Sequence, residues 1–552
     1  MPRASAIRAL RFQQAQQVQA TGYVIAAPVG GLNARDALAN MPETDAILLD
    51  NWFVQPSWVE LRRGKSTLAT FTGTCQTVAA YNSLSGTNQL YAGVISSGVG
   101  SLYRVDNAGG GVVTVASVGG AGHTIQAVTS TQYDWLQFGT GNAEVLYLLN
   151  GADNPILYDG TTFYSITAVS SPYALTNGPS PLTSLSQVVR YKSRLWFVQA
   201  GTFNVYYLPQ NVFAGALTLL PMGPNFNQGG SLAMIATNSV DNAAGINDYI
   251  AFISTQGEVV MYQGYDPAQV ATWYEAGHFQ IGRPLATGRR GWCKIGSDAA
   301  VLCIDGLTPL SKALVSDRSQ PAIAITDKIR SAINFDAQAY GANFGWQVVL
   351  YPPGTKLVIN MPTVVNSTSY HYVQNTISGA WCTFGKYNSP WNAICFERMG
   401  DNLYYGTIGS VAQCDTGTSD DGKSYVVTAK PAFSYMQDRE QLKIWTQCQP
   451  IFQVTDDMIL SINMLADFDQ TAATNTVPLS TGNAATWNVS LWNTTLWGDD
   501  EQVIKPWIGL AASGYAGSME MRANVMGITA KWQSTNYLYK PGGFFYGAPP
   551  NG

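Results

Sequence analysis

The sequence predicts an all-β protein, with a β-propeller-like body of about six or seven blades followed by a C-terminal β-sandwich-like domain. Three observations support this fold class. Charged residues make up only 12% of the 552 residues, against about 25% in an average globular domain. Short apolar strands alternate with glycine turns along most of the chain. The strands that close successive units begin about 50 residues apart, a period typical of a repeat array.

The first segment, residues 1–30, is predicted to be a basic N-terminal arm. Arg3, Arg8 and Arg11 all precede the first acidic residue, Asp36. Residues 4–19 contain neither Gly nor Pro and are rich in helix-forming Ala, Gln and Arg. Three interpretations are open: a frayed terminal helix, an arm that docks on a neighbouring subunit or ring, and a helix on a membrane surface.

Residues 31–73 are predicted to form a clamp and the first strands, and the rest of the chain is organised around residues 31–64. Charged residues crowd together there, in a protein that otherwise has few, and three large aromatics lie among them. Aromatics beside charges suit a surface that packs against a partner and fixes its register. The candidate interface residues are therefore Arg35, Trp52, Phe53, Trp58, Arg62 and Arg63, together with Arg3, Arg8 and Arg11 of the arm. The alternative is that this segment is only the first strand of the core with its cap.

Residues 74–415 are predicted to be the propeller-like body. Hairpins recur within the units, as in residues 249–262, where an apolar strand, a glycine turn and a second strand follow one another. We expect the first unit to be shared with the last strands, which would close the ring and remove its edges. One helix is predicted at residues 327–335. A pair of stacked β-sandwiches is the alternative architecture for this body.

Residues 416–424 are predicted to be a linker, and residues 425–552 a second β domain. Alternating polar and apolar residues predict strands at 460–464, 487–491 and 518–523. Residues 417–424 match the P-loop pattern GxxxxGK[ST], which would indicate nucleotide binding. The context argues against this function, because β-branched residues and a proline follow where a helix is needed, and Asp420 and Asp421 would repel phosphates.

No chemistry of a familiar kind is indicated by the remaining motifs. Seven cysteines contain no CxxC pair and are expected to be free and mostly buried, and only three histidines are present. Acid pairs such as Asp456-Asp457 are interpreted as solvated turns, with a hydrolytic pair or calcium as minor alternatives. We therefore predict no catalytic residues, no metal and no cofactor.

Charge and hydropathy limit the partners. The net charge of −5 argues against a general nucleic-acid binder, because phosphate contacts require a basic surface. It is compatible with a conduit through which DNA slides without sticking. No segment is long and apolar enough for a membrane span, and the N-terminus lacks the apolar core of a signal peptide, so synthesis in the cytoplasm is expected.

The run from residue 31 to 64 resembles the tail nozzle (tail tubular or tail hub) proteins of short-tailed bacteriophages. The similarity is close over about 35 residues and only architectural over the rest of the chain. The residues that carry it are Gly31, Leu32, Asn33, Arg35, Asp36, Leu38, Pro42, Asp45, Ala46, Asp50, Asn51, Trp52, Phe53, Pro56, Val59, Glu60, Arg62, Arg63 and Gly64.

This resemblance implies a structural virion protein and not an enzyme. It implies a ring oligomer of six copies that continues the portal channel below an adaptor ring, contacts tail fibres or a needle, and forms a conduit and gate for genome ejection. Such a protein would be made in the host cytoplasm and end up in the phage tail. The rival interpretation is a carbohydrate-binding or carbohydrate-degrading propeller, similar to a tailspike, with aromatics and two carboxylates in an exposed cleft.

Overall fold

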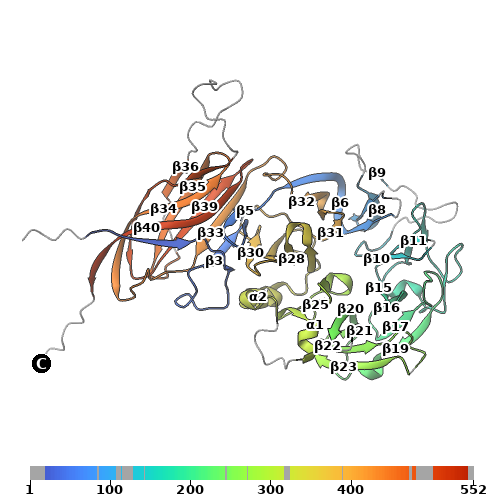
Figure 1. Cartoon of the computed structure of the whole chain (residues 1–552). Coiled ribbons are helices and arrows are strands. Elements are labelled where there is room, and N and C mark those ends of the chain that lie inside the picture. The colour runs from blue at the N-terminus through green and yellow to red at the C-terminus, as the bar shows by residue number, and fades with distance from the viewer. Residues whose placement is uncertain are drawn as a thin grey trace, which may run out of the picture.

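A computed structural model of the chain describes residues 19–83, 86, 88–106, 113–114, 128–141, 143–242, 245–269, 271–315, 324–387, 389–470, 475–479 and 501–544. Most of the described regular structure is β-strand, arranged as a ring of blades beside a two-sheet sandwich (Figure 1). The predicted all-β class, with a propeller-like body and a following β domain, is confirmed. The alternative of stacked sandwiches for the body is therefore set aside.

Five separate sheets form the blades of the ring. One is β31 (Cys395–Met399), β32 (Asn402–Cys414), β6 (Lys65–Tyr81), β7 (Gln89–Ser96), β8 (Val99–Arg104) and β9 (Val113–Thr114). The next two are β10 (Asp134–Gly139), β11 (Glu144–Leu149), β12 (Ile156–Tyr158) and β13 (Phe163–Ser165), then β15 (Leu185–Tyr191), β16 (Arg194–Gln199), β17 (Asn204–Tyr207) and β19 (Thr218–Pro221). The last two are β20 (Leu232–Asn242), β21 (Gly245–Ser254), β22 (Glu258–Gln263) and β23 (Tyr274–Gln280), then β24 (Trp292–Ile295), β25 (Asp298–Cys303) and β26 (Gly306–Pro309).

The remaining sector of the ring is filled by strands that belong to a larger sheet. These are β27 (Gln347–Tyr351), β28 (Lys356–Pro362), β29 (Ser369–Asn375) and β30 (Trp381–Phe384). Strand β27 contacts both β24 and β31, but β30 continues into the sandwich through a parallel pairing of Asp50 with Thr383. The prediction of six or seven blades is therefore wrong. The 50-residue period counted this unit as a further blade, whereas its sheet is shared with the second domain.

Both faces of the central blade strands are buried, which explains their continuous apolar runs. Along β11, Val145 and Tyr147 pack on the side of the next blade, whereas Leu146 and Leu148 pack on the side of the preceding one. Because each blade is covered on both sides by its neighbours, side chains on both faces of the strand are buried. Successive positions along the strand are therefore apolar, without the polar residues that would alternate with them on a solvated face. The ring is closed by antiparallel pairing of β32 with β6, so that one blade unites strands from both ends of the body.

The sandwich consists of two sheets. The ten-stranded sheet runs from β27–β30 through β3 (Asp45–Asp50), β33 (Tyr425–Pro431), β39 (Gly517–Val525) and β35 (Met458–Ala466) to β36 (Asn475–Leu479), with β2 (Gly31–Leu32) paired to β3. The seven-stranded sheet contains β37 (Gln502–Ile504), β34 (Gln441–Val454), β40 (Ala530–Phe544), β5 (Val59–Leu61), β4 (Trp52–Val54), β1 (Thr21–Ala26) and β38 (Ile508–Gly514).

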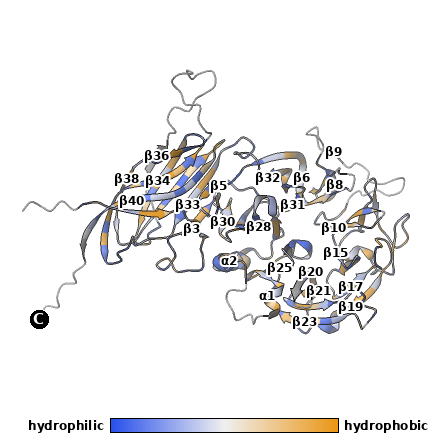
Figure 2. Ribbon diagram, in the orientation of Figure 1, coloured by the Kyte–Doolittle hydropathy of each residue, from blue (hydrophilic) through white to orange (hydrophobic). Residues whose placement is uncertain are grey.

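Polar and apolar residues alternate along strands of the sandwich (Figure 2). In β39, Met519 and Met521 are buried, whereas Arg522 and Asn524 are exposed, as expected for a sheet with one solvated face. The strands predicted at 460–464 and 518–523 are thus confirmed within β35 and β39. The strand predicted at 487–491 lies outside the described residues.

Helices are few and short in the part of the chain that the structure describes. The helix predicted at 327–335 is confirmed as η4 (Asp327–Ile329) followed by α2 (Arg330–Tyr340). The others are α1 (Leu310–Val315), η1 (Leu182–Ser184), η2 (Gly223–Asn225), η3 (Gly288–Gly291) and η5 (Pro352–Gly354), and a two-residue parallel pair joins β14 (Leu175–Thr176) to β18 (Gly215–Ala216). Within the described residues, no helix has the length and apolarity to cross a membrane. All seven cysteines are free and six of them are buried, as predicted.

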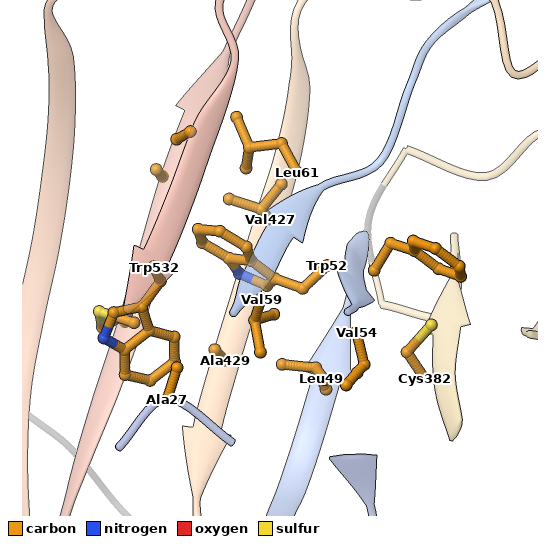
Figure 3. Close-up of a cluster of buried hydrophobic side chains, with 14 of the residues drawn as sticks. Ala27, Leu49, Trp52, Val54, Val59, Leu61, Cys382, Val427, Ala429 and Trp532 are labelled. Atoms are coloured by element: carbon orange, nitrogen blue, oxygen red, sulfur yellow. The ribbon is translucent and has the colours of Figure 1, made fainter. Parts of the chain in front are cut away.

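The N-terminal strands are part of the sandwich core. Strand β3 lies in one sheet, and β4 and β5 lie in the other. Trp52 and Leu49 project into one apolar cluster with Val427 and Trp532 from the far end of the chain (Figure 3). The segment that precedes the ring in sequence is therefore built into the domain that follows it.

Candidate functional site

Residues 31–36 form a tight loop that Asn33 holds together. The buried Asn33 side chain accepts the backbone N–H groups of Arg35 and Asp36, each at 3.0 Å. Its amide donates to Asp36 Oδ2 at 2.8 Å and to Asp45 Oδ2 at 2.7 Å. All of its polar atoms thus find partners inside the chain, as a buried amide requires. Gly31 is needed here because a Cβ at its φ of +77° would lie 2.6 Å from the Trp381 carbonyl oxygen.

This loop, together with Asp45 at the start of β3, binds the helical segment between the ring and the sandwich. Arg35 Nη1 lies 2.7 Å from Asp327 Oδ2, and Lys328 Nζ lies 2.7 Å from Asp45 Oδ1. The backbone N–H of Ala34 also donates to the Lys328 carbonyl at 2.9 Å. Arg35 keeps the pKa of Asp36 well below its usual range, at about 2. Two ion pairs and a backbone bond therefore fix η4 and α2 against the start of the sandwich, beside β3 (Figure 1).

Asp50 and Asn51 join the ring to the sandwich at the end of β3. The buried Asp50 carboxylate accepts the Thr383 hydroxyl at 2.9 Å and the backbone N–H groups of Lys386 and Tyr387. Asn51 adopts a φ of 61°, a conformation that asparagine tolerates better than most residues. Its amide reaches the Val426 carbonyl at 2.7 Å on the sandwich side. This acid–amide pair therefore binds one strand from each domain.

Arg62 is the most heavily contacted charge in this region. Its guanidinium is buried and forms a two-pronged ion pair with Asp420, at 2.9 and 2.7 Å. It also donates to Asn51 Oδ1 at 2.7 Å and lies over the rings of Tyr425, at 4.1 Å, and Trp391, at 4.8 Å. A buried charge is tolerated only when such partners replace its water shell.

Of the predicted interface residues, three are committed to the interior of this chain. Trp52, Phe53 and Arg62 are each at most 2% exposed, so their side chains offer no surface to a neighbouring subunit. Trp52 stacks on Phe452 with ring centroids 6.3 Å apart, and Phe53 meets Phe384 at 6.4 Å. The contact of Trp52 lies within the sandwich, whereas Phe53 reaches β30, whose sheet the ring and the sandwich share. From the sequence, both aromatics were assigned to a contact between subunits.

The other predicted interface residues differ in their placement. Arg35 is half exposed but is already paired with Asp36 and Asp327. Trp58 is half-buried and donates to Glu60 Oε2 at 2.9 Å. Arg63 is exposed. Arg3, Arg8 and Arg11 lie outside the described residues.

The P-loop-like segment, residues 417–424, packs against the end of the clamp. Asp420 pairs with Arg62, and Asp421 accepts from the backbone and hydroxyl of Thr67. The segment leads into strand β33 and not into a helix, so no array of helix N–H groups faces it. Gly64 lies so close that a Cβ would meet the Ser419 carbonyl oxygen at 1.9 Å. This glycine permits the close approach of two backbones.

A short helical turn blocks the axis of the ring. Residues of η3 contact β10, β15, β20, β24 and β27, which come from five different places around the ring. Arg289 and Arg290 are neighbours on this turn but line two different cavities, of about 740 and 380 Å³. The turn therefore lies between the two cavities, and we call η3 (Gly288–Gly291) the plug.

Arg290 faces the smaller cavity and anchors the plug. Its guanidinium donates to the carbonyl of Gln76 and, at 3.2 Å, to that of Ile394, and it lies 4.5 Å from the centre of the Phe344 ring. Burial lowers its pKa below the ordinary value. Because Gln76 and Ile394 belong to the closing blade and its edge, Arg290 ties the plug to the point where the ring closes.

Arg289 faces the larger cavity, which we call the axial pocket. Its guanidinium lies 3.7 Å from the centre of the Trp135 ring and 3.3 Å from Glu397 Oε2, and its backbone N–H donates to Asp134. Burial raises the pKa of Glu397 to about 7, although Arg289 opposes this shift. Burial likewise raises the pKa of Asp134 to about 6. Asp134 accepts backbone N–H groups of Val188 and Arg289, which gives it a structural role.

The axial pocket is the feature that sequence reasoning missed. Its charged lining residues are Arg190, Arg289, Lys294, Glu397 and Arg398, which are dispersed over more than 200 residues and form no local motif. One local signal exists: Arg289 and Arg290 form a dibasic pair flanked by glycines in a chain with few charges. Among the described residues, no cluster of three His, Cys, Asp or Glu side chains could hold a metal ion.

Comparison with known proteins shows only a distant likeness in fold. No family model matches the chain, and no curated protein matches it. Matching solved structures include an exo-β-1,3-galactanase from Phanerochaete chrysosporium with galactose, at 10% identity over 77% of this chain and 98% of that chain, with a TM-score of 0.25. Another is YCF48 bound to D1 peptide, at 11% identity over 68% and 99%, with a TM-score of 0.35. The WD40 β-propeller domain of Doa1 matches at 11% identity over 64% and 96%, with a TM-score of 0.35. Similarity at this level carries no argument about activity.

Proposed function

We propose that the chain is a structural subunit of the tail nozzle of a short-tailed bacteriophage. In this proposal, six copies form a ring that continues the portal channel below an adaptor ring and serves as conduit and gate for genome ejection. The same ring would offer docking surfaces to tail fibres or a needle. The chain would be made in the host cytoplasm and act in the virion.

The observation that carries this proposal is the structural role of the residues in the 31–64 run that resembles the tail nozzle proteins. Asn33, Asp45, Asp50 and Arg62 are all buried. Asp45, Asp50 and Arg62 each bond to groups more than 280 residues away, and Asn33 holds Asp45 in place. Together they fasten a ring of blades to a sandwich by ion pairs, shared strands and aromatic packing. A joint of this kind between two domains suits a subunit that keeps its shape within a ring of copies, as the proposal requires.

The plug at η3 constrains where a conduit could run. Because η3 separates the two axial cavities, DNA would not pass through the ring of a single chain. In this proposal the channel lies between copies, and the net charge of −5 limits retention of the passing phosphates.

A second candidate function is saccharide binding, which the axial pocket favours because tryptophan and polar side chains line it together. Hydrolysis is less well supported at this place. A glycosidase uses two carboxylates across the scissile bond, and the described lining of the pocket contains one, Glu397.

The proposal is tested by complementation of phage particles that lack this chain. Adding the purified chain is expected to restore triggered release of DNA. Particles that remain inactive, together with a purified chain that shortens or binds host polysaccharide, would favour the second candidate.

A further inference from the structure

The axial pocket concentrates positive charge in an acidic protein. Four cations and one carboxylate are among the residues that line it, whereas the whole chain has a net charge of −5. The cations come from four separate elements: Arg190 from β15, Arg289 from η3, Lys294 from β24 and Arg398 from β31. Their convergence is therefore a product of the fold and not of a basic stretch of sequence.

Three of these cations have no carboxylate partner in the described part of the chain. Arg190, Lys294 and Arg398 are exposed, and none forms an ion pair there. Lys294 acts through space on Asp248, but that carboxylate is already bonded to Lys192 and Ser239. Like charges in one concave site repel one another, so an anion that enters relieves this repulsion.

Glu397, the one acid among the described lining residues, does not neutralise them. Glu397 is buried and lies against Arg289, which occupies the face of the Trp135 ring. Arg398 also acts on this carboxylate through space, but one carboxylate offsets only one positive charge, so a charge of three remains among the described lining residues. Guanidinium groups such as those of Arg190 and Arg398 suit the paired oxygens of carboxylates and phosphates.

The pocket also has the size and the surface of a ligand site. Its volume of about 740 Å³ falls within the range of roughly 300 to 1,000 Å³ that small-molecule sites occupy. Trp292 is half-buried at its wall, and its indole N–H is buried without an acceptor in the described structure. The ring of Trp292 therefore offers a ligand an apolar wall, whereas its buried N–H lies out of the ligand's reach.

We propose that the axial pocket binds a small ligand that carries carboxylate or phosphate groups, held by Arg190, Arg398 and Lys294 beside Trp292. An acidic oligosaccharide and a phosphorylated small molecule share this chemistry. This site is independent of the nozzle proposal, because it lies within one chain and needs no ring of copies.

The test is isothermal titration of the full chain with three probes of similar size: tripolyphosphate, a trigalacturonate and a neutral trisaccharide. Binding of either anion, with no binding of the neutral sugar, is the expected result. The stronger of the two anions identifies the phosphate or the carboxylate source. Equal affinity for the neutral sugar would overturn the proposal, and so would an absence of binding by all three probes.

A pair of matched variants separates the site from general electrostatics. The double substitution Arg190→Gln/Arg398→Gln removes two charges from the pocket, and Arg330→Gln/Lys505→Gln removes two from exposed positions outside it. The pocket variant is expected to weaken anion binding by about tenfold for each cation removed. The outer variant should change the Kd by less than about twofold. An equal loss in both variants would show adventitious ion binding only, and would overturn the proposal. All four residues are exposed, so a melting curve suffices to verify folding.

Discussion

Replacing Arg62 with alanine is expected to loosen the junction between the ring and the sandwich. Four losses follow from the structure: the two-pronged pair with Asp420, the bond to Asn51, and the contacts with the Tyr425 and Trp391 rings. Asp420 is only 8% exposed, so the substitution leaves a buried carboxylate without its counter-charge. Breaking a buried pair in this way costs about 3 to 5 kcal/mol.

The assay is urea unfolding followed by circular dichroism, together with limited proteolysis of residues 416–424. We expect Arg62→Ala to lower the unfolding midpoint and to speed cleavage in that segment. Arg63→Ala is the matched control, because Arg63 is the adjacent exposed arginine. It should change the free energy of unfolding by no more than about 0.5 kcal/mol.

A double substitution distinguishes the unpaired charge from simple loss of contacts. In Arg62→Ala/Asp420→Ala no buried charge is left alone, so part of the stability should return. An Arg62→Ala protein as stable as the Arg63→Ala control would refute this reasoning. It would mean that the buried pair does not hold the two domains together.

Three further predictions concern pH and packing. Burial lowers the pKa of His371 to about 3, so the folded state is destabilised as pH falls below the unfolded pKa of about 6.5. The free energy of unfolding is expected to fall by about 2 kcal/mol by pH 5. Unfolding curves of His371→Phe, measured across this pH range, should not show this fall. Burial raises the pKa of Glu397 to about 7, so the pH dependence has the opposite sign to that of His371. The contribution of Glu397 to the free energy of unfolding is complete below about pH 4.5 and is lost as pH rises through 7. Glu397→Gln should remove a loss of about 3 kcal/mol between pH 4.5 and 9, measured by thermal melting, and an unchanged slope would contradict the assignment. Gly64→Ala should cost about 1 to 3 kcal/mol through its clash with the Ser419 backbone, whereas Gly509→Ala, with open space around it, should be nearly neutral in the same unfolding assay.

Much of the architecture could be predicted from the sequence. The low charge, the glycine turns and the alternation in residues such as Met519 to Ala523 report directly on strands and their burial, because these depend on local pattern. The helix at 327–335 was likewise readable from its residues. The number of blades was not, because pairing of β30 with β3 depends on a contact between residues more than 300 positions apart.

The role of the clamp was only half predictable. Trp52, Phe53 and Arg62 have the composition of an interface, and they do form one, but its other side is the same chain. Sequence alone does not distinguish a partner such as Asp420, 358 residues later, from a partner on another subunit. The axial pocket could not be predicted from the sequence, because Arg190 and Arg398 come to line one cavity only when the ring closes.

The most direct test of the nozzle proposal is electron microscopy of tail particles that lack this chain, imaged before and after addition of the purified protein. The proposal predicts added density at the distal end of the tail, with six-fold symmetry and a central channel between the copies. Particles that gain no density, while the purified chain stays monodisperse and binds polysaccharide, would contradict it.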